Sequence, residues 1–321
     1  MHFPRFTRHL AALALGSCAL LAQAADEAYP SRPVTIVVPY APGGGSDAVA
    51  RTIAKELQAE WNQPVVVENR AGAEGWIGTQ RVLSQPADGY TVLLQLNSML
   101  LWKWALPEAR IDFARDLRLL TKLQSSPVVA LVGGSVAASS LRDMMALCGK
   151  RERPCSFGTS TASAQLVGRQ LAEQGGLANA VIAPYKGTSP MVSDLLGGHI
   201  DIALVSANQA APLHADGRGK ALAVGSPARF PKMPNVATFA EAGYTIGGSN
   251  TWYGLMVRQD TPDAVVQKIT AAVQRAGRKP EVLAAIATQG GVAVFNSPDE
   301  FSREFAAELQ AITPVAEKFL K

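Results

Sequence analysis

The chain has 321 residues, of which 48% are hydrophobic and 17% are charged, and its formal net charge is +4. This composition is sufficient for a packed core, and the length is typical of one large or two medium domains. The small net charge and the lack of a basic run in the sequence argue against nucleic-acid binding.

Residues 1–24 are predicted to be a secretory signal peptide. Two arginines precede the apolar run 10–21, and Ala22-Gln23-Ala24 matches an A-x-A cleavage site. The run is shorter than the ~20 residues of a spanning helix, which disfavours a membrane anchor. Cys18 lies in a weak lipobox, so a lipoprotein is the alternative. Cleavage after Ala24 removes two of the 30 basic residues and none of the 26 acidic ones, leaving a net charge of +2 in a periplasmic protein.

A glycine-rich turn follows the first predicted strand. The β-branched run 34–38 ends at Pro39, and Gly43, Gly44 and Gly45 precede a helical pattern that begins near Asp47. Glycine allows a sharp turn that presents backbone N–H groups, and Ser46 or Asp47 is expected to cap the helix. The free N–H groups and the helix dipole favour an anion, so we predict an anion site at this turn.

Strands and helices alternate along the rest of the chain, with strands about 30 residues apart. Such spacing indicates βαβ crossovers and an α/β fold with parallel strand pairs. The predicted helices are 47–60, 77–84, 135–147, 165–175, 190–196, 261–278, 280–289 and 298–319; the predicted strands and apolar runs are 64–69, 90–95, 119–132, 180–185, 199–205 and 220–224.

Cys148 and Cys155 remain after removal of the signal peptide. An even number of cysteines in an exported protein favours a disulfide, here a structural one that closes a short charged loop. Two free thiols are the alternative. The spacing is not that of a C-x-x-C redox motif.

The sequence gives little support for an enzyme. His199 and His214 are the only histidines after residue 24, too isolated for a metal cluster, and no G-x-S-x-G motif or Walker-type phosphate loop is present. Gly72, Gly75 and Gly78 follow a strand, but their spacing departs from the G-x-G-x-x-G dinucleotide motif. We therefore expect a binding protein with no metal and no cofactor.

Short motifs along nearly the whole chain resemble the extracytoplasmic solute-binding receptors of the tripartite tricarboxylate transporter family, also known as the Bug family. Each motif is weak alone, but their order and spacing are specific. They include Pro39-Tyr-Ala-Pro-Gly-Gly44, Val67-Glu-Asn-Arg-Ala-Gly72, Ala87-Asp-Gly-Tyr90, Pro184-Tyr-Lys-Gly187, Asp194-Leu-Leu-Gly-Gly198 and Trp252-Tyr-Gly254.

The resemblance implies a two-lobe periplasmic binding protein of type II, with a mixed, mostly parallel sheet flanked by helices in each lobe. Lobe one is expected at residues 28–125 plus 248–321, and lobe two at 126–247. The implied function is capture of a small carboxylate (a di- or tricarboxylate, an acidic amino acid or an aromatic acid) by a monomer, and its delivery to a membrane permease. A periplasmic sensor that contacts a kinase is the alternative.

The resemblance also implies that one loop from each lobe binds the ligand. Several of these residues have a second interpretation: Asp47 as a helix cap, Tyr185 as core, Lys186 as a surface residue, Asp201 as a solvated acid and Ser206 as part of a turn. The candidate residues are Tyr40, Ala41, Pro42, Gly43, Gly44, Asp47 and Ser98 in lobe one, and Thr159, Ser160, Ser163, Tyr185, Lys186, Asp201 and Ser206 in lobe two.

The sequence departs from the family pattern at three places. The second loop, Gly158–Leu166, is about two residues shorter than usual and has Gln165 in place of a histidine. Glu74 stands where glycine is usual, and we interpret it as a surface residue. Trp102 and Trp104 replace a more polar stretch, and we expect them to pack in the core, with narrowing of the cleft as the alternative.

Overall fold

The computed structural model describes residues 29–226 and 228–320. The predicted signal peptide, with its cleavage site and Cys18, lies outside the described residues. Within the described part, no helix combines the length and hydropathy that a membrane crossing requires.

The strands form one continuous curled sheet of mixed direction, with the order β2-β1-β3-β9-β4-β7-β5-β6. Parallel pairs lie toward its two ends (β1 with β2 and β3, β5 with β6 and β7), and antiparallel pairs through β4 and β9 lie in the middle. The strands are β1 (Val34–Val38), β2 (Val65–Asn69), β3 (Thr91–Leu96), β4 (Leu117–Gly133), β5 (Ser156–Thr159), β6 (Val181–Pro184), β7 (Ile202–Ser206), β8 (Gly219–Val224), β9 (Asn250–Arg258) and β10 (Val292–Ala293).

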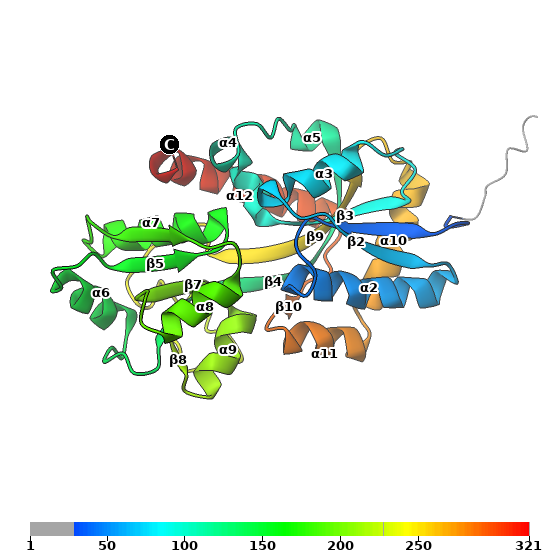
Figure 1. Ribbon diagram of the computed structural model, residues 1–321. Helices are drawn as coiled ribbons and strands as arrows, with labels where there is room; N and C mark the ends of the chain where they lie inside the picture. The colour runs from blue at the N-terminus through cyan, green and yellow to red at the C-terminus, as the bar shows by residue number, and fades with distance from the viewer. Residues whose placement is uncertain (1–28, 227, 321) are drawn as a thin grey trace, which may run out of the picture.

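Helices flank both ends of the sheet (Figure 1). Their starts follow ordinary capping chemistry: Ser140 and Thr161 cap two of them through their hydroxyls, and Ser297 and Glu300 form a capping box. The helices are α2 (Gly45–Trp61), η2 (Ala73–Gly75), α3 (Trp76–Leu83), η3 (Asn97–Leu101), α4 (Trp102–Ala105), α5 (Phe113–Asp116), α6 (Leu141–Gly149), α7 (Ala162–Gln174), α8 (Thr188–Leu196), α9 (Ala207–Ala215), α10 (Asp263–Ala276), α11 (Pro280–Thr288) and α12 (Pro298–Phe319).

The hydrophobic core is divided between two lobes, as the sequence predicts. In lobe one, β1, β2, β3 and β9 are covered by α2, α10 and α11 on one face and by α3 and α12 on the other. In lobe two, β5 to β8 and the end of β4 lie between two further clusters that include α6 to α9. Trp102 is buried in the lobe-one core, so the expectation that it packs there rather than in a cleft is confirmed.

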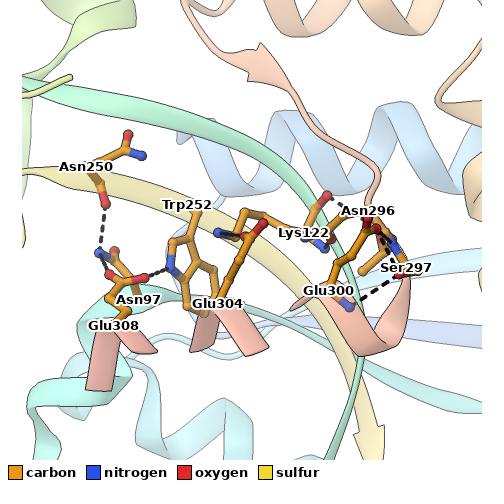
Figure 2. A network of polar contacts seen from close by, with 10 residues as sticks. Asn97, Lys122, Asn250, Trp252, Asn296, Ser297, Glu300, Glu304 and Glu308 are labelled. Carbon is orange, nitrogen blue, oxygen red and sulfur yellow. Dashed lines mark hydrogen bonds and ion pairs between the residues drawn. The ribbon is translucent and has the colours of Figure 1, made fainter. Parts of the chain in front are cut away.

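Two long strands join the lobes. β4 pairs with β9 in lobe one and continues into lobe two, where it pairs with β7 and β8 (Figure 1). At the crossing, Asn97 donates to the Asn250 carbonyl (2.9 Å) and to Glu308 of α12 (3.1 Å), and Glu308 accepts from the Trp252 indole N–H (2.6 Å; Figure 2). These contacts attach α12 to the strand that links the lobes.

The predicted disulfide between Cys148 and Cys155 is present and closes the loop between α6 and β5. Asp201 holds the same loop: its buried carboxylate accepts from Arg151 (2.5 Å), Arg153 (2.6 Å) and the Ser156 amide (2.9 Å). Asp201 precedes β7 at the amino end of parallel strands, whereas Ser160 follows β5 at the carboxyl end. The prediction that Asp201 binds ligand is therefore wrong, because its carboxylate is hydrogen-bonded to this loop at the edge of the sheet opposite Ser160.

Candidate functional site

The glycine turn lies between β1 and α2, as the sequence predicts. Residues 41–44 are exposed, and Gly43 has the positive φ (83°) that a side chain would disfavour. The N-cap of α2 is Gly44, and no side chain caps the helix. The first amide groups of α2 are thus left for an external acceptor, which is the arrangement that favours an anion.

Asp47 fixes the shape of this turn. One carboxylate oxygen accepts from the Gly43 amide and from Arg51 (both 3.0 Å), and the other accepts from Asn69 (3.0 Å), which also donates to the Tyr40 carbonyl (3.1 Å). Burial opposes ionisation of Asp47, but these hydrogen bonds outweigh it and lower its pKa. Both oxygens have protein partners, so Asp47 positions the turn, and the predicted helix cap is not observed.

Tyr40 and Ser98 lie behind the turn. The Tyr40 hydroxyl contacts the Gln95 side chain (3.0 Å), the Ser98 hydroxyl (3.2 Å) and the Glu74 carbonyl (3.4 Å). Burial raises the pKa of Tyr40. Ser98 is itself buried, so the two residues connect the glycine turn to η2 and support the site from within lobe one.

The second predicted loop lies at the start of α7. Thr159 is fully buried and its hydroxyl donates to the Ala183 carbonyl (3.4 Å), while Thr161 caps Ala164 (3.1 Å). Ser160 is half-buried, and Ser163 is buried with no partner for its hydroxyl among the described residues. Thr159 is thus part of the strand scaffold, and Ser160 and Ser163 remain candidates for ligand binding.

Three further candidates lie at the carboxyl edge of the lobe-two sheet. Tyr185 donates to Asp194 (2.6 Å), which raises the pKa of Tyr185 to about 12, and its amide bonds to Thr159. Lys186 is exposed and forms no ion pair with the residues that the structure describes.

The Ser206 hydroxyl donates to the side-chain oxygens of Asn208 and Gln209 at the start of α9. The structure therefore brings Lys186 and Ser206 to the same edge as Ser160.

The sequence interpretation missed Tyr253. It considered Asn208 either as a hydrogen-bond donor or as part of a turn, and both residues lie where the lobes meet. A Cβ atom at Gly45 would stand 2.8 Å from the Tyr253 hydroxyl and 3.5 Å from the Asn208 amide nitrogen. Burial raises the pKa of Tyr253 to about 12. The start of α2 therefore faces a hydroxyl from β9 and an amide from lobe two. The motif Trp252-Tyr-Gly254 was the signal that could have found Tyr253.

The expectation that Glu74 is a surface residue is wrong. Its side chain is half-buried, and its carbonyl accepts from the Trp102 indole N–H (3.1 Å). Burial raises the pKa of Glu74, and the Ala162 amide opposes that rise.

Known proteins share this architecture over most of the chain. Residues 49–317 match the model of the tripartite tricarboxylate transporter family receptor. The chain is 31% identical to Protein BugT of Bordetella pertussis over 310 residues, 95% of each chain. Among solved structures, R. palustris Rpa4515 with adipate has a TM-score of 0.80 at 26% identity (90% of this chain, 97% of that one), and MatC from Rhodopseudomonas palustris with bound malate has a TM-score of 0.78 at 26% identity (90% and 100%).

Proposed function

The chain belongs to the tripartite tricarboxylate transporter receptor family, and on that premise we propose that it captures a small organic carboxylate between its lobes and delivers it to the membrane permease of such a transporter. Malate and adipate, the ligands named for two of its structural relatives, are both carboxylates. The relatives named as receptors favour transport over the sensor alternative. A periplasmic, monomeric, non-enzymatic protein is part of this proposal.

We place one ligand carboxylate at the start of α2. The observation that carries this assignment is the uncapped helix start at Gly44 and Gly45, opposite the Tyr253 hydroxyl and Asn208. Backbone N–H groups and a hydroxyl are all donors, and together with the helix dipole they suit a carboxylate. Ala41, Pro42 and Gly43 shape the exposed turn, and Ser160, Ser163, Lys186 and Ser206 complete the site from lobe two.

The lobes proposed for this movement are residues 28–125 plus 248–321 and residues 126–247. Shared strands near Ser126 and Asn250 act as the hinge, since β4 and β9 pair there and then diverge. In the ligand-bound form, lobe two closes on lobe one and the permease binds the closed surface. Closure is supported by a hydrophobic cluster within each lobe. Ala162 and Leu166 of α7 also pack against lobe one, and that contact would have to part when the lobes open.

A thermal-shift screen tests this function. Residues 25–321, freed of ligand by unfolding and refolding, are heated with a panel of mono-, di- and tricarboxylates, acidic amino acids and aromatic acids. A ligand at 100 times its dissociation constant stabilises the folded state by about 2.7 kcal/mol, which raises the melting temperature by several degrees. A selective shift with one acid is expected. A folded protein that responds to none of them would contradict carboxylate capture.

A further inference from the structure

Gln124 is a buried polar residue of β4 whose side-chain oxygen has no partner. Only 1% of the residue is exposed, and its Oε1 accepts no hydrogen bond from the residues that the structure describes. A buried acceptor without a donor is unfavourable, and the large majority of such groups in folded proteins are paired. A donor group of a bound ligand would supply the missing partner.

Gln124 lies on the face of the sheet that carries the proposed site. It pairs with Tyr253 of β9, and paired residues of antiparallel strands direct their side chains to the same face. That face carries the start of α2, because a Cβ atom at Gly45 would stand 2.8 Å from the Tyr253 hydroxyl. Trp252, the preceding residue of β9, packs on the other face against Phe301 of α12. Gln124 is thus the neighbour of a residue that already faces the start of α2.

Two glycines after α11 bring Gln124 close to Asn208 of lobe two. A Cβ atom at Gly291 would stand 2.6 Å from the Gln124 Oε1, and one at Gly290 would collide with the Asn208 backbone. These glycines directly precede β10, which pairs with β4 (Figure 1). The Asn208 amide nitrogen in turn lies 3.5 Å from the Cβ position of Gly45. Gln124 therefore borders the same space as Asn208 and the start of α2.

The polar groups around this space match a carboxylate that has a hydroxyl beside it. The amides of α2 and the Tyr253 hydroxyl are donors, and so is the Asn208 amide nitrogen, since the Asn208 oxygen already accepts from Ser206. A carboxylate has acceptors alone, so it satisfies these donors and leaves the Gln124 oxygen unpaired. A hydroxyl on the carbon next to the carboxylate is a donor at the right end of the ligand.

A hydroxyl suits this position better than an ammonium group. An ammonium group carries a full positive charge and three donors, and a buried charge needs a partner of opposite sign. The carboxylate of the turn, Asp47, has protein partners on both oxygens. Gln124 offers one neutral oxygen, which matches one neutral donor.

We infer that Gln124 is a specificity-determining residue that accepts a hydrogen bond from a 2-hydroxyl group of the ligand, so that the receptor selects 2-hydroxycarboxylates over the same acids without the hydroxyl. The inference rests on the proposed function, in which a carboxylate binds at α2. A site that is built to bond a hydroxyl binds an analogue without it less tightly, because the buried polar group of the protein then stays unpaired.

Calorimetry with matched pairs of acids tests this selectivity. The pairs are lactate and propionate, malate and succinate, 2-hydroxyglutarate and glutarate, and mandelate and phenylacetate. In each pair that binds, wild type is expected to favour the hydroxy acid at least about tenfold, and Gln124→Met to reduce the ratio to within about threefold by weaker binding of the hydroxy acid. Gln267→Met, at an exposed position of α10, should behave as wild type.

A second variant moves the Gln124 amide without replacing it. Gly291 does not have a positive φ, so its backbone accepts alanine, and the added Cβ atom would displace the amide of Gln124. Gly291→Ala should therefore also lower the preference for hydroxy acids. Gln124→Met should not lower the melting temperature, because the oxygen that it removes has no partner. A lowered melting temperature with an unchanged preference would show a structural role and overturn the inference.

The outcomes separate this inference from the function on which it rests. Equal affinities within every pair for wild type, or a preference that neither variant changes, would overturn the role of Gln124 while leaving carboxylate capture intact. Tighter binding of the corresponding 2-amino acids (alanine, aspartate, glutamate and phenylglycine) would overturn the choice of a hydroxyl. If none of these acids binds, a carboxylate found in the thermal-shift screen would leave capture standing without the selectivity, and a screen without any carboxylate would contradict both.

Discussion

The Tyr253 hydroxyl is a donor that the fold holds against the start of α2. Tyr253 is buried in lobe one, and its hydroxyl lies near Gly45, where the site is proposed. A donor fixed in a packed strand loses little entropy when it binds a ligand, so it contributes more to affinity than a mobile surface hydroxyl.

Tyr253→Phe should weaken ligand binding without unfolding the protein. Loss of one hydrogen bond costs about 0.5–1.5 kcal/mol, or roughly a two- to twelvefold rise in the dissociation constant. Calorimetry with the acid found in the thermal-shift screen measures this change. Tyr244→Phe, which alters a buried tyrosine in the core of lobe two, is the matched control. Equal affinities for Tyr253→Phe and wild type would remove Tyr253 from the site.

At the scale of the element, the loop between α6 and β5 shows how a short charged segment is held. The disulfide closes it, and the Asp201 carboxylate gathers two arginines and the Ser156 amide at its base. Burial opposes ionisation of Asp201, but the hydrogen bonds from Arg153 and Ser156 outweigh it and lower its pKa. Ionised Asp201 therefore stabilises lobe two.

Asp201→Asn should destabilise the protein at neutral pH and reduce its sensitivity to acid. The stabilisation by Asp201 is fully present above the ordinary aspartate pKa of about 3.9 and is lost as the pH falls through the lowered native pKa. We expect a loss of about 1–3 kcal/mol at pH 7 that becomes smaller toward pH 2, measured by urea unfolding. Asp216→Asn, at an exposed ion pair, is the control. A loss that is the same at both pH values would contradict this account.

The helical elements were predictable because their signals are local. The capping box at Ser297 and Glu300 and the 3.6-residue periodicity locate α12, and the glycines locate the turn before α2. Asp201 was misassigned because a residue beside a strand gives no sign of which end of the sheet it occupies. The burial of Glu74 depends on contacts between segments far apart in the chain, such as the hydrogen bond from Trp102 to its carbonyl, and no local pattern records these. The motif Trp252-Tyr-Gly254 marks Tyr253, but its place beside Gly45 is visible only in the fold.

At the scale of the molecule, the connection between the lobes combines two strands with a network of buried polar groups. Figure 2 shows Glu308 of α12 between Asn97 and Trp252, with Lys122 paired to Glu304 nearby. Asn97 is also bonded to the Asn250 carbonyl at the start of β9, where we propose the hinge. The network therefore joins α12 to the strand that crosses between the lobes.

Glu308 makes the free energy of unfolding depend on pH with a sign opposite to that of Asp201. Burial raises the pKa of Glu308, although hydrogen bonds from Trp252 and Asn97 oppose the rise. The folded state thus keeps a proton on Glu308 at pH values where the unfolded chain has lost it. The free energy of unfolding therefore falls as the pH rises from the ordinary glutamate pKa of about 4.3 through the raised native value.

Glu308→Gln should abolish this decrease in the free energy of unfolding with rising pH. Glutamine keeps one acceptor for Trp252 but not both acceptors, so the variant is expected to be about 0.5–1.5 kcal/mol less stable than wild type near pH 4. The difference should shrink toward pH 8, because only wild type then bears the cost of a buried charge. Urea unfolding from pH 4 to 8 measures it, with Glu317→Gln on the same helix as the control. A difference that stays constant or grows with pH would show that Glu308 is held ionised by its partners, and would contradict this account.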